Sequence, residues 1–220
     1  DALPADAVTA VDEMHIAGDG PGGRLTFSAW QQGVEALAWI VDAAALEATL
    51  QTAARFAPHL TMLVDAETAA DGAPLTVLAE GKDSASRAAL GVRFERQPYG
   101  HTALAARLVA DQPHAGVARQ WFRAPDVLAL LPFDRPEAGR SFGLVWSLPA
   151  ARAAELQAAA PAELEAALAE ATGGAAGHLR LASPVAAWPL ALAQPTGCAA
   201  PAGCWWAMRR TRCIRWPARA

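Results

Sequence analysis

The sequence predicts an α/β fold with α+β character, in which an antiparallel sheet domain is inserted into an α/β domain. Up to residue 91, short apolar runs alternate with stretches of helical pattern. From residue 92 onward, strand-like segments follow one another with turn signals between them, as in an antiparallel sheet. Two helical stretches and a final extended segment come next, which is the order expected when one domain interrupts another. A chain of 220 residues suffices for one large domain or two small ones.

The N-terminal part is expected to begin with a β-hairpin. VTAVDEMHI (8–16) predicts a strand, GDGPGG (18–23) a turn, and RLTFSA (24–29) the returning strand. ALAWIV (36–41) is another apolar run with strand character. The pattern therefore predicts three strands before the first helix.

A helix is expected over residues 43–56, capped at its N-terminus by Asp42. Leu46, Leu50 and Phe56 lie on one side of this helix and predict a single buried stripe.

A polar loop with short strands on both sides follows this helix. HLTMLV (59–64) and PLTVLA (74–79) predict the strands. AEGKDSASRAALGV (79–92) then predicts a strand end, a glycine turn, and a short helix that ends at Gly91.

The second half of the chain is expected to form the antiparallel sheet and the elements that cover it. The predicted strands cover residues 92–97, 101–111, 116–124, 127–133 and 141–149. Two helices are expected next, at 149–159 and 160–174, the second with Pro161 near its start and glycines after its end. Residues 178–194 return to extended structure.

Charge and composition exclude several classes of protein. The net charge is −4, and the stretch from Cys204 onward carries five arginines and no acid, which leaves −9 for the rest. This excess of negative charge before Cys204 argues against a protein that binds nucleic acids in general. All three cysteines lie after residue 197, so the body is not a disulfide-stapled domain. No apolar run is long enough to span a bilayer, and no signal-peptide pattern is present.

Three ordered stretches carry a family resemblance. They are GVEALAWIVDAAALEATL, LTVLAEGKDSASRAALGV, and the long run that begins HTALAARLVADQPHAGVARQWF and closes with LRLASPVAAWPLALAQ. Together they resemble the ubiquinone-biosynthesis hydroxylase branch of the class A FAD-dependent monooxygenases, from about Val8 to Gln194. The resemblance implies an FAD/NAD(P)-binding domain fragment with an inserted antiparallel-sheet substrate domain.

The same resemblance implies a function. The enzyme would use FAD, NAD(P)H and O2 to hydroxylate an aromatic ring, with an aromatic or polyprenyl phenol as substrate and no nucleic-acid partner. A cytoplasmic location is expected, and peripheral association with the inner membrane is left open. The sequence identifies no catalytic side chain.

The most specific local similarity is AEGKDSASR, which resembles the family segment A-D-G-x-x-S-x-x-R. The resemblance implies cofactor-binding roles for Glu80, Gly81, Ser84 and Arg87 near the flavin pyrophosphate. Glycine lets the backbone approach a phosphate, and serine and arginine can bond oxyanions. Glu80 stands where the family has Asp. The alternative is a plain strand–turn–helix with a Ser/Asp cap.

Several family features are missing from the chain. GDGPGG (18–23) follows no parallel-strand pattern and opens no helix, so it is interpreted as a hairpin turn and not as the family's early G-x-G-x-x-G. The late Gly-Asp motif is absent in frame. The resemblance therefore implies an N-terminally truncated protein. Ala44 also replaces an arginine that many relatives carry; if that arginine contacts the flavin, the contact is lost.

The remaining candidates are aromatic residues and histidines. Trp121 and Trp146 could line an aromatic pocket, but core positions are favoured. The histidines at 101, 114 and 178 lack ligand spacing, so they are interpreted as surface or loop residues and no metal site is predicted.

The last residues support a frameshift hypothesis. Trp206 ends in G and Ala207 begins with GC, so a frame one base earlier has a glycine codon there. Trp216 and Pro217 force alanine in the same frame. The shifted tail is compatible throughout with LVGDAAHTVHPLAGQG, which resembles the missing late motif. We therefore expect the chain to be out of frame from about Pro195, through a genuine frameshift or a sequence error.

The expected domain organisation follows from these assignments. Residues 1–41 are substrate-domain strands and a return, 42–92 are part of the FAD-binding domain, 93–194 are the substrate-binding sheet and the return to the FAD domain, and 195–220 are the out-of-frame tail. The leading hypothesis is a hydroxylase fragment that is inactive as this exact chain. The alternatives are a non-catalytic remnant or binding module without flavin, and an Arg/Trp-rich tail that binds nucleic acid or anionic membrane.

Overall fold

The structure is a computed structural model that describes residues 3–20, 22–63, 77, 79–81, 85–89, 94–195, 199–200 and 203–204. The chain divides into two compact units. One comprises Asp1–Phe56 with His101–Pro189, and the other Ala57–Gly100 with Leu190–Ala220. Each unit is described on its own.

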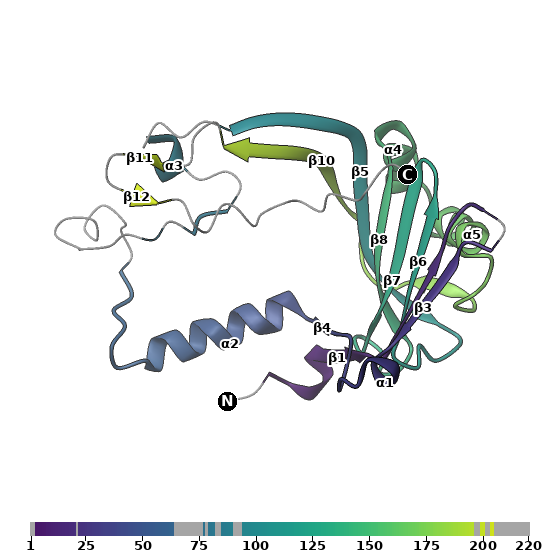
Figure 1. The fold of residues 1–220 in the computed structure, drawn as a ribbon, viewed down its shortest axis with the longest axis horizontal. Coiled ribbons are helices and arrows are strands. Elements are labelled where there is room, and N and C mark those ends of the chain that lie inside the picture. The colour runs from purple at the N-terminus through teal and green to yellow at the C-terminus, as the bar shows by residue number, and fades with distance from the viewer. Residues whose placement is uncertain are drawn as a thin grey trace. The chain divides into compact units, whose positions relative to one another are not determined.

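A large mixed sheet dominates the first unit (Figure 1). Its strands lie in the order β10-β5-β8-β7-β6-β2-β3, with β9 also paired to β5. Their bounds are β2 (Glu13–Ala17), β3 (Arg24–Ser28), β5 (Phe94–Ala110), β6 (Val117–Arg123), β7 (Asp126–Phe133), β8 (Ser141–Pro149), β9 (Leu179–Leu181) and β10 (Ala186–Pro195). The antiparallel pairing expected from the sequence is confirmed for β5, β6, β7 and β8.

The sequence predicted an antiparallel sheet, but the sheet is mixed, because one of its strand pairs is parallel. Strand β2 runs parallel to β6, with Ala17 opposite Trp121. Hairpin turns impose antiparallel pairing only on strands that are neighbours in sequence. Since β2 and β6 are far apart in the chain, no turn fixes their relative direction.

The N-terminal hairpin is confirmed, but its first strand is split. β2 and β3 pair through the glycine-rich turn as expected. The predicted strand over 8–16 is instead two strands, because β1 (Val8–Val11) pairs with β4 (Ala38–Val41) in a separate two-stranded sheet. Asp12 makes the break: its N–H donates to the Gly116 carbonyl and its carbonyl accepts from the Ala29 N–H, both at 2.8 Å. A short helix, α1 (Ala29–Gln32), follows β3.

Two helices cover one face of the large sheet, and both were predicted. They are α4 (Ala150–Ala158) and α5 (Pro161–Thr172). α5 begins at a proline and ends at Gly173, whose φ of 61° is the left-handed conformation that ends helices. Leu156, Leu164 and Leu168 from these helices join one hydrophobic core with sheet residues such as Leu104. Burial of this face is the main source of the fold's stability.

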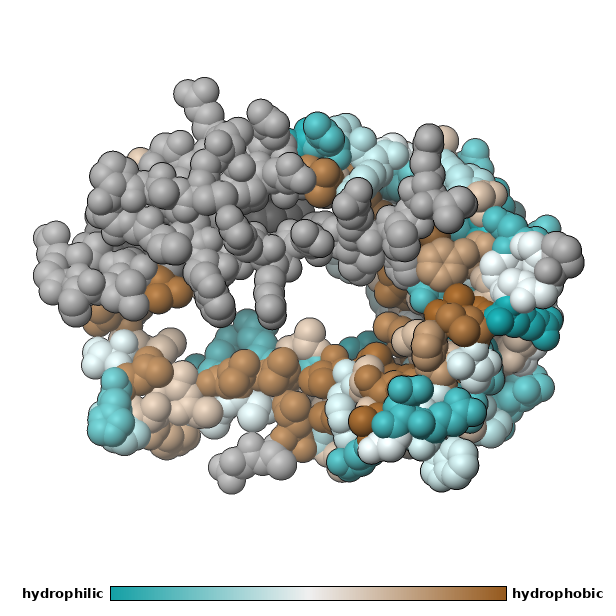
Figure 2. Space-filling view, viewed as in Figure 1, coloured by the Kyte–Doolittle hydropathy of each residue, from teal (hydrophilic) through white to brown (hydrophobic). Residues whose placement is uncertain are grey.

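The helix α2 (Ala43–Phe56) forms where the sequence predicted it. Asp42 caps it as expected, because its Oδ1 accepts hydrogen bonds from the backbone N–H groups of Ala44 and Ala45 at 3.0 and 3.2 Å. The predicted burial was wrong. The three residues of the apolar stripe are 38%, 59% and 83% exposed, and no residue of the helix is buried. Figure 2 shows the apolar side chains along this helix.

The second unit contains less regular structure among its described residues. A short helix, α3 (Ala85–Ala89), lies where one was predicted, and its expected end at Gly91 falls outside the described residues. Residues 59–63 were predicted as a strand but form none, because no neighbouring strand pairs with them in the described part. Of the predicted strand at 74–79, only residues 77 and 79 are described, and neither is in a strand.

The C-terminal tail lies almost wholly outside the described residues. Apart from Pro195 at the end of β10, only β11 (Ala199–Ala200) and β12 (Gly203–Cys204) are described, as a small antiparallel pair. The proposed late motif at 205–220 is therefore not described. Within the described parts of the chain, none of the helices has the length and apolar character needed to cross a bilayer.

Candidate functional site

The two faces of the large sheet differ in what covers them. Alternate residues of a strand point to opposite faces, so the side that does not pack on α4 and α5 is set by the register. On that side Ala105, Val145 and Ala129 lie directly opposite one another across β5, β8 and β7. Gly143 and Leu131 form the next row. All five are only half-buried. We call these five small and aliphatic residues the apolar face.

A charged cluster borders the apolar face. Arg107, opposite Gly143 in the register, donates from Nη2 to Asp42 Oδ2 at 2.8 Å, and its guanidinium lies 4.7 Å from the centre of the Phe133 ring. Arg135 reaches the same carboxylate oxygen at 3.5 Å and binds Asp6 at 2.7 Å. Asp42 therefore has one oxygen for the helix cap and one for the arginines.

The environment of Asp42 favours its charged form. The side chain is only 5% exposed. The hydrogen bond from Arg107 lowers the pKa of Asp42, burial raises it, and the backbone N–H groups of the helix cap lower it further, so that the net pKa is below its ordinary value. The cluster ties the start of α2 to strand β5 by a partly buried ionic contact.

A second polar cluster surrounds Asp134. Its carboxylate accepts hydrogen bonds from Thr9 Oγ1 at 2.9 Å and from the Gly139 N–H at 2.7 Å. His114 Nδ1 accepts from the Gly116 N–H at 3.1 Å, so Nε2 carries the proton and donates to Asp134 at 3.3 Å. Burial raises the pKa of Asp134, but the hydrogen bonds outweigh it and the net pKa is lowered.

The histidine prediction needs one correction. His114 lies in a loop but is 6% exposed, so it is a buried structural residue and not a surface one. Its hydrogen bonds explain the burial, since both ring nitrogens have partners. His178 is an exposed bend residue, whereas His101 lies in β5. The described residues contain no group of three metal-ligating side chains.

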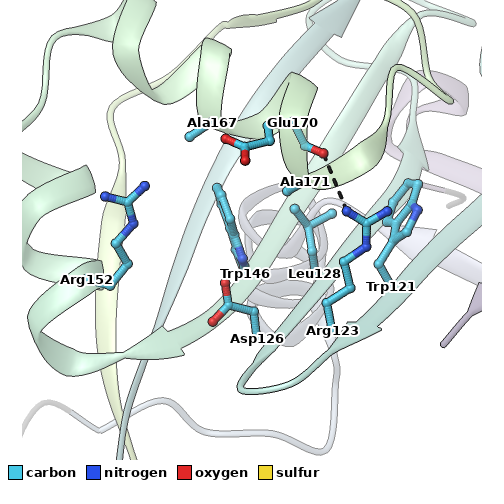
Figure 3. Close-up of a pocket in the computed structure, with 9 residues that line it drawn as sticks. All are labelled: Trp121, Arg123, Asp126, Leu128, Trp146, Arg152, Ala167, Glu170 and Ala171. Carbon is cyan, nitrogen blue, oxygen red and sulfur yellow. Dashed lines mark hydrogen bonds between the residues drawn. The ribbon is translucent and has the colours of Figure 1, made fainter. Parts of the chain in front are cut away.

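The two tryptophans belong to the core and also line a cavity. Trp121 and Trp146 are 7% and 4% exposed and pack within the hydrophobic core, as the sequence favoured. They also border a small cavity of about 210 Å³ between the sheet and α5, together with Asp126, Arg152 and Glu170 (Figure 3). The prediction that both tryptophans are core residues is confirmed. Both also line this cavity.

Asp126 is a half-buried acid of this cavity. Burial raises the pKa of Asp126, and His101, Arg152 and Trp146 lower it by a smaller amount. The indole Nε1 of Trp146 is buried and forms no hydrogen bond of good geometry with the described residues, although Figure 3 shows it directed toward the Asp126 carboxylate. The Trp146–Asp126 contact is therefore electrostatic and weak, which leaves a buried donor incompletely satisfied.

The predicted flavin turn is only partly described. Glu80 accepts hydrogen bonds from the Ser86 N–H at 3.2 Å and from Ser86 Oγ at 2.5 Å, so it caps the start of α3. Gly81 has φ of +77°, which glycine adopts readily. Ser84 lies outside the described residues, as does the side chain of Arg87, whose backbone is in α3.

The described part of this turn does not by itself fit a flavin. Both oxygens of Glu80 are used by Ser86, and a carboxylate adds no donor for a pyrophosphate. A Cβ atom at Gly81 would have no described atom within 4 Å, so it is the positive φ and not a crowded neighbour that favours glycine at this position. We derive no chemical step through a flavin from these residues. Ala44, at the start of α2, is exposed and contributes only its backbone N–H to the Asp42 cap.

Sequence reasoning missed the ionic partners of Asp42. The sequence signal was present, since Arg107 interrupts the apolar run of β5. A cation within such a run requires a nearby anion or an exposed edge. The partner could not be named in advance, because Asp42 and Arg135 come from distant parts of the chain.

Comparison with known proteins identifies the fold. No family model matches the chain. A mutant of PqsL from Pseudomonas aeruginosa is similar in structure, with a TM-score of 0.60 and 21% identity over 84% of this chain and 56% of that one. A second PqsL structure, described as a probable FAD-dependent monooxygenase, has a TM-score of 0.57 and 17% identity over 91% of this chain and 61% of its own.

A flavin-dependent halogenase, CmlS, is also similar, with a TM-score of 0.54 and 14% identity over 90% of this chain and 40% of that one. The chain thus spans little more than half the length of the PqsL structures. At these identities the likeness concerns the fold alone, and the fold of this chain resembles part of the fold of the PqsL and CmlS structures.

Proposed function

We propose that this chain is part of an FAD-dependent aromatic-ring hydroxylase. The observation that carries the proposal is the structural likeness to the PqsL mutant, which extends over 84% of the chain at a TM-score of 0.60. The ordered sequence similarity to the hydroxylases supports it, because it covers both the region around Glu80–Arg87 and the strands of the large sheet. In such an enzyme the reduced flavin supplies the oxygen-activating chemistry when it is bound.

The apolar face is the surface that we assign to the aromatic substrate. Ala105, Ala129 and Gly143 leave room for a ring to lie flat against the sheet, and Val145 and Leu131 add apolar contact. These side chains bring no polar group that would need hydration, so a ring laid on them loses contact with water on the side that faces the sheet. Arg107 is held at the border by Asp42 and can orient a polar end of the ligand.

We propose further that the substrate is a polyprenyl phenol of the ubiquinone-biosynthesis type. The support is the sequence resemblance together with an apolar face that suits a ligand with one polar end and a long apolar tail. A cytoplasmic enzyme with peripheral inner-membrane association fits such a substrate, since its tail partitions into lipid.

The chain as written should bind FAD weakly or not at all. The described half of the predicted turn contacts α3, and GDGPGG (18–23), which has the G-x-G-x-x-G spacing, joins the antiparallel strands β2 and β3 instead of opening a helix. The rival function is a non-catalytic binding module without flavin, and the engagement of Glu80 by Ser86 is the observation that favours it.

The decisive experiment uses the coding DNA on both sides of this segment. We would express the extended protein, with the frame restored after Gln194, and record its visible absorbance and its NAD(P)H consumption with and without a phenolic substrate. The proposal predicts bound flavin and substrate-stimulated NAD(P)H oxidation. An extended protein that folds but holds no flavin would overturn it in favour of the binding module.

A control separates the site from the fold. Ala129→Glu places a charge on the apolar face without touching the helix-covered core, so it should abolish substrate stimulation and leave the flavin spectrum unchanged. A matched change on the exposed side of α2, Ala48→Glu, should alter neither.

A further inference from the structure

A second, larger groove lies on the helix side of the sheet, beyond the end of α5. Its volume is about 700 Å³, within the range of small-molecule sites. The floor is formed by β6, β2 and β3, and the C-terminal end of α5 forms a wall. The side chains that the argument uses are Ala17, Arg24, Arg119, Trp121 and Arg123.

The strand register gathers these residues on one face. Ala17 lies opposite Trp121 on β6 and opposite Arg24 on β3, which makes one row across three strands. His15 lies opposite Arg119 and Thr26 in the neighbouring row on the same face. Arg24 and Arg119 are two strands apart and lie in neighbouring rows, so their backbones are separated by about 12 Å and their long side chains can converge on one ligand.

The arginines of this groove have no carboxylate partners among the described residues. In that part of the chain, the only side-chain hydrogen bond of Arg119 is a long one, 3.5 Å, to the Val117 carbonyl, and the side chain of Arg24 forms none. Arg123 donates at 3.5 Å to the Glu170 carbonyl near the end of α5. Partial burial lowers the pKa of Arg119, because removal from water disfavours the charged form and no carboxylate of the described residues compensates for it.

The acids near the groove are already engaged. Glu13 binds His15 at 2.8 Å, and Asp19 accepts the Ala124 N–H at 2.9 Å. The last carbonyls of α5 carry partial negative charge, but those of Glu170 and Ala169 accept from the N–H groups of Gly173 and Gly174. The charged side chains that line the groove itself are Arg24, Arg119 and Arg123, so its lining is positive in a protein of net charge −4.

We propose that this groove binds a small anionic molecule. Arg119 and Arg24 hold its carboxylate or phosphate, which the planar guanidinium group matches with paired hydrogen bonds. Ala17 and the accessible edge of Trp121 contact its apolar part. The site lies on the opposite side of the sheet from the apolar face, so it is separate from the proposed substrate surface.

Calorimetric titration of the full 220-residue chain tests this proposal. Pyrophosphate and benzoate serve as probes, and the one that binds more tightly identifies the class of anion. Single-site binding is expected for at least one of them, weaker at high salt. Arg119→Gln should weaken it about tenfold or more, and Arg24→Gln should weaken it as well.

The control is Arg55→Gln, which removes an exposed arginine from the last turn of α2 and should leave binding unchanged. Melting curves followed by circular dichroism establish that each variant is folded, and Arg24 lies on an exposed edge strand where substitution carries little risk. The proposal would be overturned if neither probe showed saturable binding at millimolar concentration. It would also be overturned if Arg55→Gln weakened binding as much as Arg119→Gln. No flavin is involved, so failure here is distinct from failure of the proposed hydroxylase function.

Discussion

The helices α2 and α5 carry similar sequence patterns but have opposite surroundings. Both present leucines at helical spacing and both have clear start signals. Leu164 and Leu168 of α5 are 1% and 0% exposed, whereas Leu50 of α2 is 59% exposed. Periodicity determines which side of a helix is apolar. Whether that side is buried depends on the surface available to it, and the described residues provide one for α5 only.

The same comparison explains how α2 is held. It has no buried side chain of its own, so its attachment within its unit depends on Asp42, which caps it and binds Arg107. α5 is held instead by apolar burial over the sheet. One helix is thus attached by a localised ionic contact and the other by a distributed hydrophobic one.

The largest expected effect is a core truncation in α5. Leu168→Ala should lower the free energy of unfolding by about 2 to 5 kcal/mol, because it removes buried apolar contacts and leaves a cavity. The matched substitution in α2, Leu50→Ala, should change it by less than about 0.5 kcal/mol. Urea denaturation of both variants measures the difference. Equal losses would show that α2 is buried in solution.

The attachment of α2 is tested by Asp42→Ala. The variant loses the helix cap and leaves Arg107 without its partner, so the free energy of unfolding should fall by about 2 kcal/mol. Helix content, followed by circular dichroism, should fall with it. Asp42→Asn keeps the cap and should recover part of the loss; if it recovers all of it, the ionic contact contributes nothing.

Acid should weaken the same contact. The pKa of Asp42 is lowered on folding, so its stabilising effect is complete above the unfolded-state pKa of about 3.9 and is lost as the pH falls through the lower folded-state value. The stability difference between wild type and Asp42→Asn should therefore shrink when urea denaturation at pH near 7 is repeated at pH near 3. A difference that grows in acid would contradict the assigned direction.

The smallest effect concerns the cavity beneath α5. Burial raises the pKa of Asp126, so its charged form is disfavoured by folding and the protein gains stability as the pH falls below that pKa. Asp126→Asn should leave the stability at pH 7 unchanged or increase it by less than about 0.5 kcal/mol. A clear loss at neutral pH would mean that the carboxylate has a favourable partner.

Local features could be predicted from the sequence, and long-range ones could not. The Asp42 cap, the helix that starts at Pro161 and the hairpin at GDGPGG each depend on residues close in the chain, and each is present. The parallel pairing of β2 with β6 and the burial of His114 depend on contacts between distant segments. Periodicity and turn chemistry do not encode such contacts.

The same distinction between local and long-range features applies to the candidate site residues. The core positions of Trp121 and Trp146 followed from their place in apolar strands. The groove at Arg24 and Arg119 needs three strands in register, which the sequence could not supply. For the flavin turn, Glu80 forms a helix cap that any strand–turn–helix could use, so that segment remains a prediction for Ser84 and Arg87.

The most direct test of the flavin-hydroxylase account is the nucleotide sequence that encodes residues 204–220. The account predicts that this DNA, translated one base earlier, spells LVGDAAHTVHPLAGQG and so restores a Gly-Asp turn directly after the last strand of the sheet. Codons that encode a different sequence in that frame would contradict it. The chain would then lack the late flavin-binding turn, and the non-catalytic module would be the better description.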